Sequence, residues 1–117
     1  MMRRYSCEEK NTQKACIDIL KLYGYVVIRN NSGKIILGSP NGKKRAIKIG
    51  TPGASDIIAC SPEGKFVAIE VKSKQGKLTE KQKNFLTKIE KNNGIALVIK
   101  DINDLFVFLK DNQSKKI

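Results

Sequence analysis

The chain has 117 residues, and 23 lysines and arginines against 11 acidic residues give it a net charge of +12. Such a length allows one domain with a single modest core, and no apolar run approaches the roughly 20 residues that cross a membrane. The sequence contains no histidine, which excludes histidine-dependent nucleases, Ser-His hydrolases and His-ligated zinc, while the positive charge favours a polyanionic partner such as nucleic acid.

The first predicted element is a helix that begins after Ser6 and ends at Gly24. Ser6 and Glu9 have the spacing of a capping box, and apolar residues follow at helical spacing as far as Tyr23. Extending this apolar stripe backwards reaches Gln13 and Glu9. The helix would therefore direct two polar side chains along its buried face.

Extended segments follow the helix. Residues 25–29 predict a first strand that residues 34–37 continue in extended form, and residues 46–49 predict another strand. Glycine, proline and asparagine mark the turns between them. A basic group that could neutralise phosphates lies in this part of the chain: it consists of Lys43, Lys44, Arg45 and Lys48.

The next two segments, residues 57–60 and 66–69, predict a β-hairpin joined by a turn that contains proline and glycine. The simplest register pairs Cys60 with Phe66. The residues beyond the apolar ends of both strands then also face each other, and these residues are charged.

Counting outwards from that pair places Asp56 opposite Glu70. Directly opposed residues have Cβ atoms about 4.5–5.5 Å apart, and like charges there are destabilising. Lys72 shares the strand face of Glu70, because side chains alternate with a period of two. Two carboxylates and a lysine beside apolar residues therefore predict a site for a divalent cation.

A polar link leads into a predicted helix that begins at Thr79 and closes at residues 92–94. Thr79 and Gln82 have capping-box spacing, but Gln82 also lies on the apolar face with Phe85. Gln82 is therefore either a cap without a catalytic role or a side chain aimed at the sheet and the site. A second basic group surrounds this helix start: Lys74, Lys77, Lys81 and Lys83.

Residues 95–99 form an unbroken apolar run, which is typical of a central strand covered on both faces. Residues 102–109 predict a final helix before a frayed polar tail. The order α-β-β-β-β-α-β-α predicts an α/β fold, a mixed sheet flanked by helices. We expect one domain over residues 1–117, with its core at about 6–110.

The ordered set resembles the VRR-NUC branch of the PD-(D/E)XK, or restriction-endonuclease-like, superfamily, which includes small phage-type and DNA-repair nucleases. Ser55 stands where the motif's name expects proline, and Asn11 and Thr12 stand where the family commonly has an acidic residue. The resemblance covers about residues 8–109. Its matching parts are Gln13 and residues 24–25, 29–31, 53–56, 68–72 and 78–82.

The resemblance implies an Mg²⁺- or Mn²⁺-dependent endonuclease that hydrolyses phosphodiester bonds of DNA. Lys72 would orient or deprotonate the attacking water. The implied metal ligands are Asp56, Glu70 and the backbone carbonyl of Val71, with either Glu9 or Gln13 as the residue of the first helix that serves the metal. The implied catalytic residues are Asp56, Glu70, Lys72 and Gln82, and Arg29 is a further residue of the pattern.

Small stand-alone relatives and junction resolvases further imply a homodimer that acts on branched or structured DNA, such as Holliday junctions. The DNA-binding residues would be the two basic groups described above. Two alternatives remain open: a non-catalytic nucleic-acid-binding module of the same fold, and a basic RNA-binding protein. The chain begins without the apolar segment of a signal peptide, so we expect a cytoplasmic protein with no membrane partner.

Overall fold

The computed structural model describes the backbone of residues 2–30, 33–38, 41–49 and 53–114, and the side chains of residues 8–30, 38, 41–44 and 53–112. Four strands form a mixed sheet in the order β1-β4-β5-β6, and β2 and β3 form a separate two-stranded sheet. The elements are α1 (Met2–Leu22), β1 (Val26–Arg29), β2 (Gly33–Gly38), β3 (Lys44–Ile49), β4 (Ile57–Cys60), β5 (Phe66–Val71), α2 (Glu80–Lys91), β6 (Ile95–Ile99) and α3 (Ile102–Ser114).

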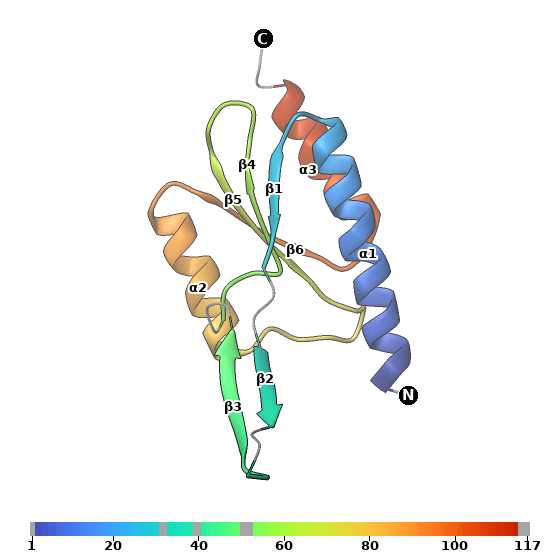
Figure 1. The fold of residues 1–117 in the computed structure, drawn as a ribbon. Coiled ribbons are helices and arrows are strands. Elements are labelled where there is room, and N and C mark those ends of the chain that lie inside the picture. Colours follow the sequence, from blue (N-terminus) through green and yellow to red (C-terminus); the bar gives the residue numbers. More distant parts are fainter. Residues whose placement is uncertain (1, 31–32, 39–40, 50–52, 115–117) are drawn as a thin grey trace.

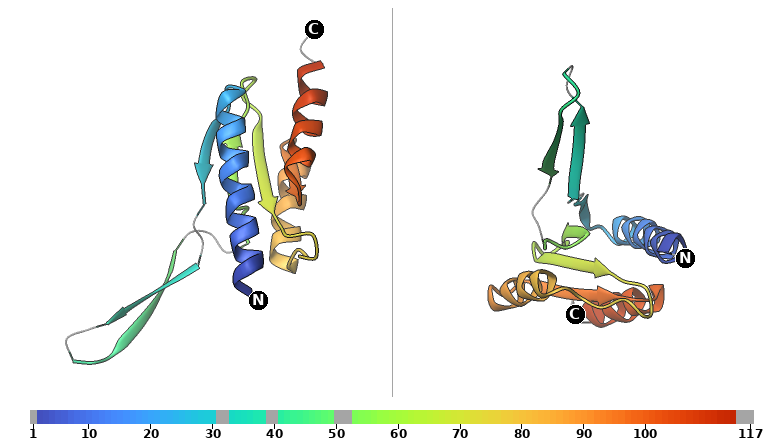
Figure 2. Two further views of the ribbon diagram at one scale, coloured as in Figure 1. Left: turned by 90° about the vertical axis from the view of Figure 1, so that its right-hand side faces the viewer. Right: turned by 90° about the horizontal axis from the view of Figure 1, so that it is seen from below.

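The four-stranded sheet lies between two layers of helices. α1 and α3 pack against each other on one face, α1 across β1 and β5 and α3 against β6. α2 covers the other face along β5 and β6 (Figures 1 and 2). The β2–β3 hairpin projects away from this body, beyond the edge formed by β1 (Figure 2).

The predicted α/β fold, a mixed sheet flanked by helices, is confirmed, and so is the predicted order of elements with one addition. The addition is β2: residues 34–37 belong to a strand of their own instead of continuing the first strand. This strand pairs antiparallel with β3, from Gly33 opposite Ile49 to Gly38 opposite Lys44.

α1 begins earlier than the sequence predicts. It starts at Met2, so Ser6 lies inside the helix and the predicted N-cap at Ser6 is wrong. The predicted end is confirmed: Gly24 has a φ of 88°, a conformation that glycine adopts without steric cost. The amide of Tyr25 closes the turn by donating to the carbonyl of Leu20 at 3.0 Å.

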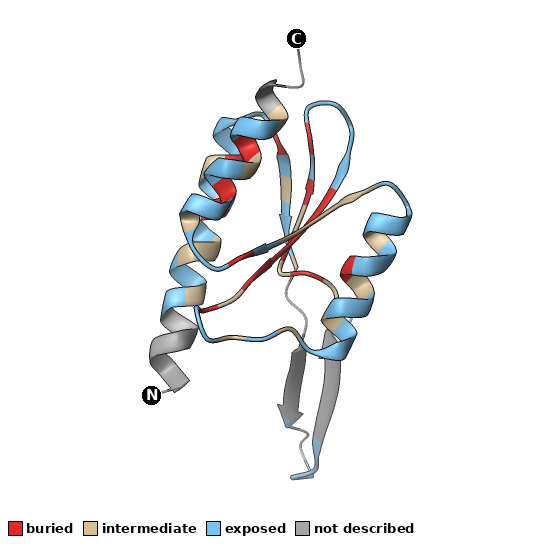
Figure 3. Cartoon of the chain, turned by 180° about the vertical axis from the view of Figure 1, so that it is seen from behind, coloured by how far each residue is buried: buried red, intermediate tan, exposed pale blue. Residues whose placement is uncertain are grey.

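The main core fills the layer between α1, α3 and the sheet (Figure 3). Alternate residues of β4 face this layer, because side chains along a strand alternate between its two faces. The buried members are Cys16, Leu20, Tyr25, Ile57, Ala59, Val67, Ile69, Val71, Ile99, Leu105 and Leu109.

The central, fully buried strand is β5. All of its residues from Val67 to Val71 are buried, including one acid, Glu70. β6 was predicted to be central from its apolar run, but it lies at the edge of the sheet, parallel to β5. Its sequence is apolar because α2 and α3 pack on its two faces.

The two remaining helices begin where the sequence predicts. Thr79 is the N-cap of α2 and Asn92 is its C-cap. α3 extends through Ser114, so the first part of the predicted frayed tail is helical, and residues 115–117 lie outside the described chain. None of the helices in the described ranges is long and apolar enough to cross a membrane.

Candidate active site

The β4–β5 hairpin has the register that the sequence predicts. Cys60 pairs with Phe66, and the pairing continues to the end of β4. The next position outwards holds Asp56 on one side and Glu70 on the other. The register of the hairpin therefore places two acids opposite each other at one end of it.

Asp56 lies directly before β4 in a loop that is fixed on three sides. One of its carboxylate oxygens, Oδ2, accepts a hydrogen bond from the amide of Val71 at 3.2 Å. Its backbone carbonyl accepts from the amide of Asn30 at 2.8 Å. Gly53 has a φ of 81°, and a Cβ there would lie 2.9 Å from Cβ of Lys81, so this loop packs directly on the start of α2.

Glu70 is only 1 % exposed. Its Oε2 accepts a hydrogen bond from Nε2 of Gln82 at 3.3 Å, whereas Oε1 has no hydrogen-bond partner among the described residues. A buried polar atom without a partner costs about 1–3 kcal/mol. The fold therefore keeps one carboxylate oxygen available for a proton or a cation, next to Asp56.

Electrostatics at this pair favour the neutral form of Glu70. Its pKa is raised to about 8, first because burial disfavours the charged carboxylate, and then because the neighbouring carboxylate of Asp56 favours a protonated Glu70. The charge of Lys72 acts in the opposite direction, and that of Glu9 raises the pKa further. In the protein alone, Glu70 therefore favours its protonated form near neutral pH, and a divalent cation would displace that proton.

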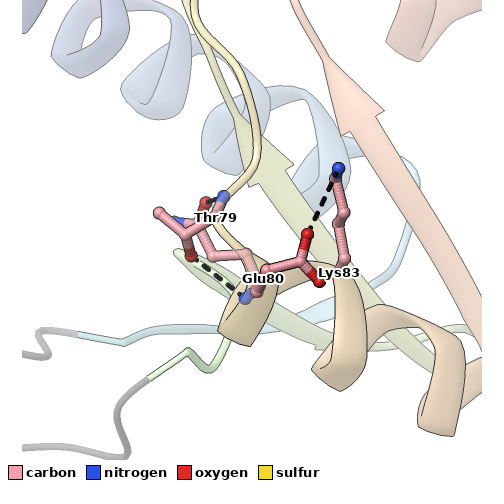
Figure 4. A network of polar contacts seen from close by, with 4 residues as sticks. Thr79, Glu80 and Lys83 are labelled. Carbon is pink, nitrogen blue, oxygen red and sulfur yellow. Dashed lines mark hydrogen bonds and ion pairs between the residues drawn. The ribbon is translucent and has the colours of Figure 1, made fainter.

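Gln82 makes both of the contacts that its position in the sequence allowed: it caps α2 and it reaches Glu70. The backbone amide of Gln82 donates to Oγ1 of Thr79 at 3.2 Å. The side-chain Oε1 of Gln82 accepts from the backbone amide of Thr79 at 2.9 Å, which completes a capping box. Its Nε2 remains free for Glu70. Figure 4 shows this helix start together with the ion pair between Glu80 and Lys83, whose charged atoms are 3.8 Å apart.

Lys72 follows β5 directly and is half-buried. Its charge lowers the pKa of Glu70, as expected for neighbours on one strand face. Two hollows adjoin it, one of about 540 Å³ and one of about 290 Å³. Lys72 thus lies where the buried strand opens to the surface, two residues beyond Glu70.

The two candidates on α1 have different partners. Oε2 of Glu9 accepts a hydrogen bond from the amide of Ser73 at 3.2 Å, so Glu9 reaches the link that follows β5. Oε1 of Gln13 accepts instead from Nη2 of Arg29 at 3.2 Å, and this pair joins α1 to β1. Glu9 is the one whose charge acts on Glu70.

The two predicted basic groups lie in different parts of the molecule. Lys74, Lys77 and Lys81 are exposed around the link and the start of α2. Lys43 and Lys44 are exposed at the far end of the projecting hairpin. The side chains of Arg45 and Lys48 lie outside the described residues.

Sequence reasoning missed two contributors. Ser73 supplies the amide that holds Glu9, and Lys100 borders both hollows beside Lys72. Lys100 follows β6, and the parallel pairing of Val71 with Ile99 brings it next to Lys72. The sequence does place Lys100 directly after the apolar residues 95–99. It does not show which strand those residues pair with, and so it does not bring Lys100 next to Lys72.

The donor set suits a hard divalent cation. Asp56 and the free oxygen of Glu70 are carboxylate oxygens, which Mg²⁺ and Mn²⁺ prefer. Within the described ranges, no three histidine, cysteine, aspartate or glutamate side chains form a group that could hold a metal. An ion held by the acid pair would complete its shell with backbone oxygen and water, as Mg²⁺ commonly does.

Comparison with known proteins identifies the family of this chain. Residues 7–100 match the model of the VRR-NUC domain. A solved structure described as a VRR-NUC domain is similar to this fold, with a TM-score of 0.63 and 18% sequence identity, covering 88% of this chain and 95% of the other. No curated protein sequence matches. The fold is of the nuclease type, and the chain belongs to the VRR-NUC domain family.

Proposed function

We propose that this protein is an Mg²⁺- or Mn²⁺-dependent endonuclease that hydrolyses phosphodiester bonds of DNA. The observation that carries the proposal is the acid pair: the buried Glu70 has a carboxylate oxygen without a partner in the described part of the chain, beside Asp56. Keeping such a group buried costs stability. An acid pair with a buried Glu70 at the end of β5, next to Lys72, is the arrangement expected of a functional site.

Each residue of the site has a distinct task in such a hydrolysis. The ion, when bound, would polarise the scissile phosphate and lower the pKa of a water molecule. Asp56 and Glu70 would hold it. The backbone amide of Val71 orients the carboxylate of Asp56, and the side-chain amide of Gln82 orients that of Glu70. Lys72 would orient the attacking water and offset the negative charge that develops on the phosphate.

A cleavage panel tests this function. Purified protein is incubated with labelled junction, flap, nicked and linear DNA, and with RNA, in Mn²⁺, in Mg²⁺ or in chelator. We expect metal-dependent cutting that is lost in Asp56→Asn and Lys72→Met. Asp18→Asn is the matched control, because Asp18 is an exposed acid on α1, and it should cut normally.

The outcomes separate the competing functions. Absence of cutting of every substrate by the unaltered protein contradicts the enzyme, and equal cutting by Asp56→Asn points to a contaminant. DNA binding that needs no metal and survives Glu70→Ala favours a binding module. RNA that displaces every DNA form at matched salt favours an RNA-binding protein.

We further propose that the protein acts as a homodimer on branched DNA, where two-fold symmetry presents two sites to two strands. The support is an apolar surface at the edge of the sheet, opposite the face that α1 covers. Val26 and Ile28 on the edge strand β1 are 67% and 62% exposed. A second copy would cover this surface and pair with the open side of β1.

Light scattering tests the dimer. Ile28→Lys should convert it to a monomer, because a buried charge there would have no partner. Val107→Lys on α3 is the matched control, since Val107 is also 62% exposed but lies on another face. A monomeric unaltered protein, or equal disruption by both substitutions, contradicts this surface.

A further inference from the structure

The two hollows beside Lys72 differ in charge. The larger one, about 540 Å³, is lined by three acids, Glu8, Glu9 and Asp101, as well as by lysines. The smaller one, about 290 Å³, has no acid among its lining residues. Its charged lining consists of four lysines: Lys72, Lys77, Lys83 and Lys100.

These four lysines come from separate segments that the fold brings together. The amide of Lys72 donates to the carbonyl of Ile99 at 2.9 Å, which sets Lys100 beside it across the parallel strands. Lys77 belongs to the link after β5, and Lys83 to the first turns of α2. Three of the lysines thus come from the basic stretch of residues 72–83, and the tertiary fold adds Lys100 to them.

The ammonium groups of lysines that line one hollow repel one another. The contacts of Lys83 and Lys100 compensate this repulsion only in part. Glu80 contacts Lys83 at 3.8 Å, but both side chains are exposed and such pairs contribute about 0–1 kcal/mol. Nζ of Lys100 donates to the carbonyl of Lys74 at 3.5 Å, which supplies no negative charge. An anion in the hollow would relieve the repulsion.

We propose that the smaller hollow binds a backbone phosphate of the DNA strand next to the scissile phosphate, so that the strand leaves the site over Lys83 and Lys100. The proposal rests on the proposed function, since Lys72 borders both this hollow and the acid pair. The larger hollow is less suited to guide the strand, because the carboxylates of Glu8, Glu9 and Asp101 offset the charge of its three lysines. The four-lysine hollow thereby sets the direction of the bound strand.

The test measures binding in chelator, where no cutting occurs. A labelled DNA strand and its duplex are titrated at a series of salt concentrations with the unaltered protein and with Lys83→Gln and Lys100→Gln. For each substitution we expect the slope of log K against log salt to become shallower by about 0.7 on the single strand and 0.9 on the duplex. Lys100→Arg, which keeps the charge, should restore the slope.

Two controls make the result specific. Lys88→Gln removes an exposed lysine from α2 that borders neither hollow, and Lys74→Gln removes one that borders only the larger hollow. Lys88→Gln should leave the slope unchanged, and Lys74→Gln should change it less than Lys100→Gln. Equal effects of Lys88→Gln and Lys100→Gln, or a larger effect of Lys74→Gln, would overturn the proposal.

Neutral methylphosphonates then locate the phosphate. Replacing single phosphates around the cut position should weaken binding to the unaltered protein at one neighbouring position and leave binding to Lys100→Gln unchanged there. Loss of affinity at that position in both proteins would contradict the contact. If one methylphosphonate position weakens binding only when Lys100 is present, and the protein cuts no DNA, the nuclease is refuted but the strand path is not. If the protein cuts DNA but no position depends on Lys100, only the strand path is refuted.

Discussion

Two successive hairpins of this chain have opposite characters. The β4–β5 hairpin lies inside the sheet, and an acid, Glu70, is buried at the end of its central strand. The β2–β3 hairpin projects from the body (Figure 2), and the lysines at its far end are exposed. Charge next to the core is held in a fixed geometry that suits chemistry. Charge on a projecting hairpin supplies only electrostatic attraction to a polyanion.

The sharpest test of this contrast is Glu70→Gln. Cleavage should fall about 10³-fold or more, because the metal's contribution of several kcal/mol to the transition state depends on that carboxylate. In chelator at pH 8, the same variant should unfold at a higher temperature, since the buried negative charge is gone. Cleavage rates and thermal unfolding measure the two effects, and effects of the same sign would contradict the role of Glu70.

The pH dependence of stability follows from the same group. The pKa of Glu70 is about 8 in the folded protein against an ordinary value of 4.5, so the folded state binds more protons between these values. The metal-free protein should therefore lose stability, on the order of a few kcal/mol, as the pH rises from about 4.5 to about 8. Urea unfolding across this range should show the loss, and Glu70→Gln should remove most of it.

Gly53→Ala tests how tightly the loop of Asp56 is held. The φ of 81° and the approach of 2.9 Å to Cβ of Lys81 should together cost about 2–3 kcal/mol and lower cleavage. Gly64→Ala is the matched control: its φ is 87°, but no atom lies within 4 Å of the added Cβ. It should cost about 1 kcal/mol, and equal losses would mean that the packing on α2 is unimportant.

The double role of Gln82 predicts a separation between two variants. Thr79→Ala and Gln82→Ala should each lose about 1 kcal/mol of unfolding free energy, because each removes the capping box. Only Gln82→Ala also removes the hydrogen bond to Glu70, so only it should lower cleavage, by about 10–100-fold. Comparable cleavage by both variants would reduce Gln82 to a cap.

The smallest effects belong to the projecting hairpin. Lys43→Gln and Lys44→Gln should each reduce the salt slope of DNA binding by about 0.7–0.9. They should change the unfolding free energy by no more than about 0.5 kcal/mol. Cleavage at saturating substrate should not change, and a fall in that rate would place this hairpin in the chemistry and remove the contrast.

The local signals that predicted the fold were periodicity and turn chemistry. Alternation and turn residues predicted β4 and β5 with their register, and the Thr79–Gln82 spacing predicted the start of α2. Ser6 misled because a capping pattern is weak when helix-favouring residues precede it. The apolar run of β6 led to the wrong prediction of a central strand. A strand that helices cover on both faces is apolar at the edge of a sheet as well as at its centre.

By itself, the sequence determined which acids meet, because the hairpin register depends on local alternation, and Asp56 and Glu70 follow from it. Only the tertiary structure decided the surroundings of that pair: the burial that raises the pKa of Glu70, the contact of Glu9 with Ser73, and the meeting of Lys72 with Lys100. These contacts join residues far apart in the chain. They depend on how layers and parallel strands pack, and no local pattern encodes that.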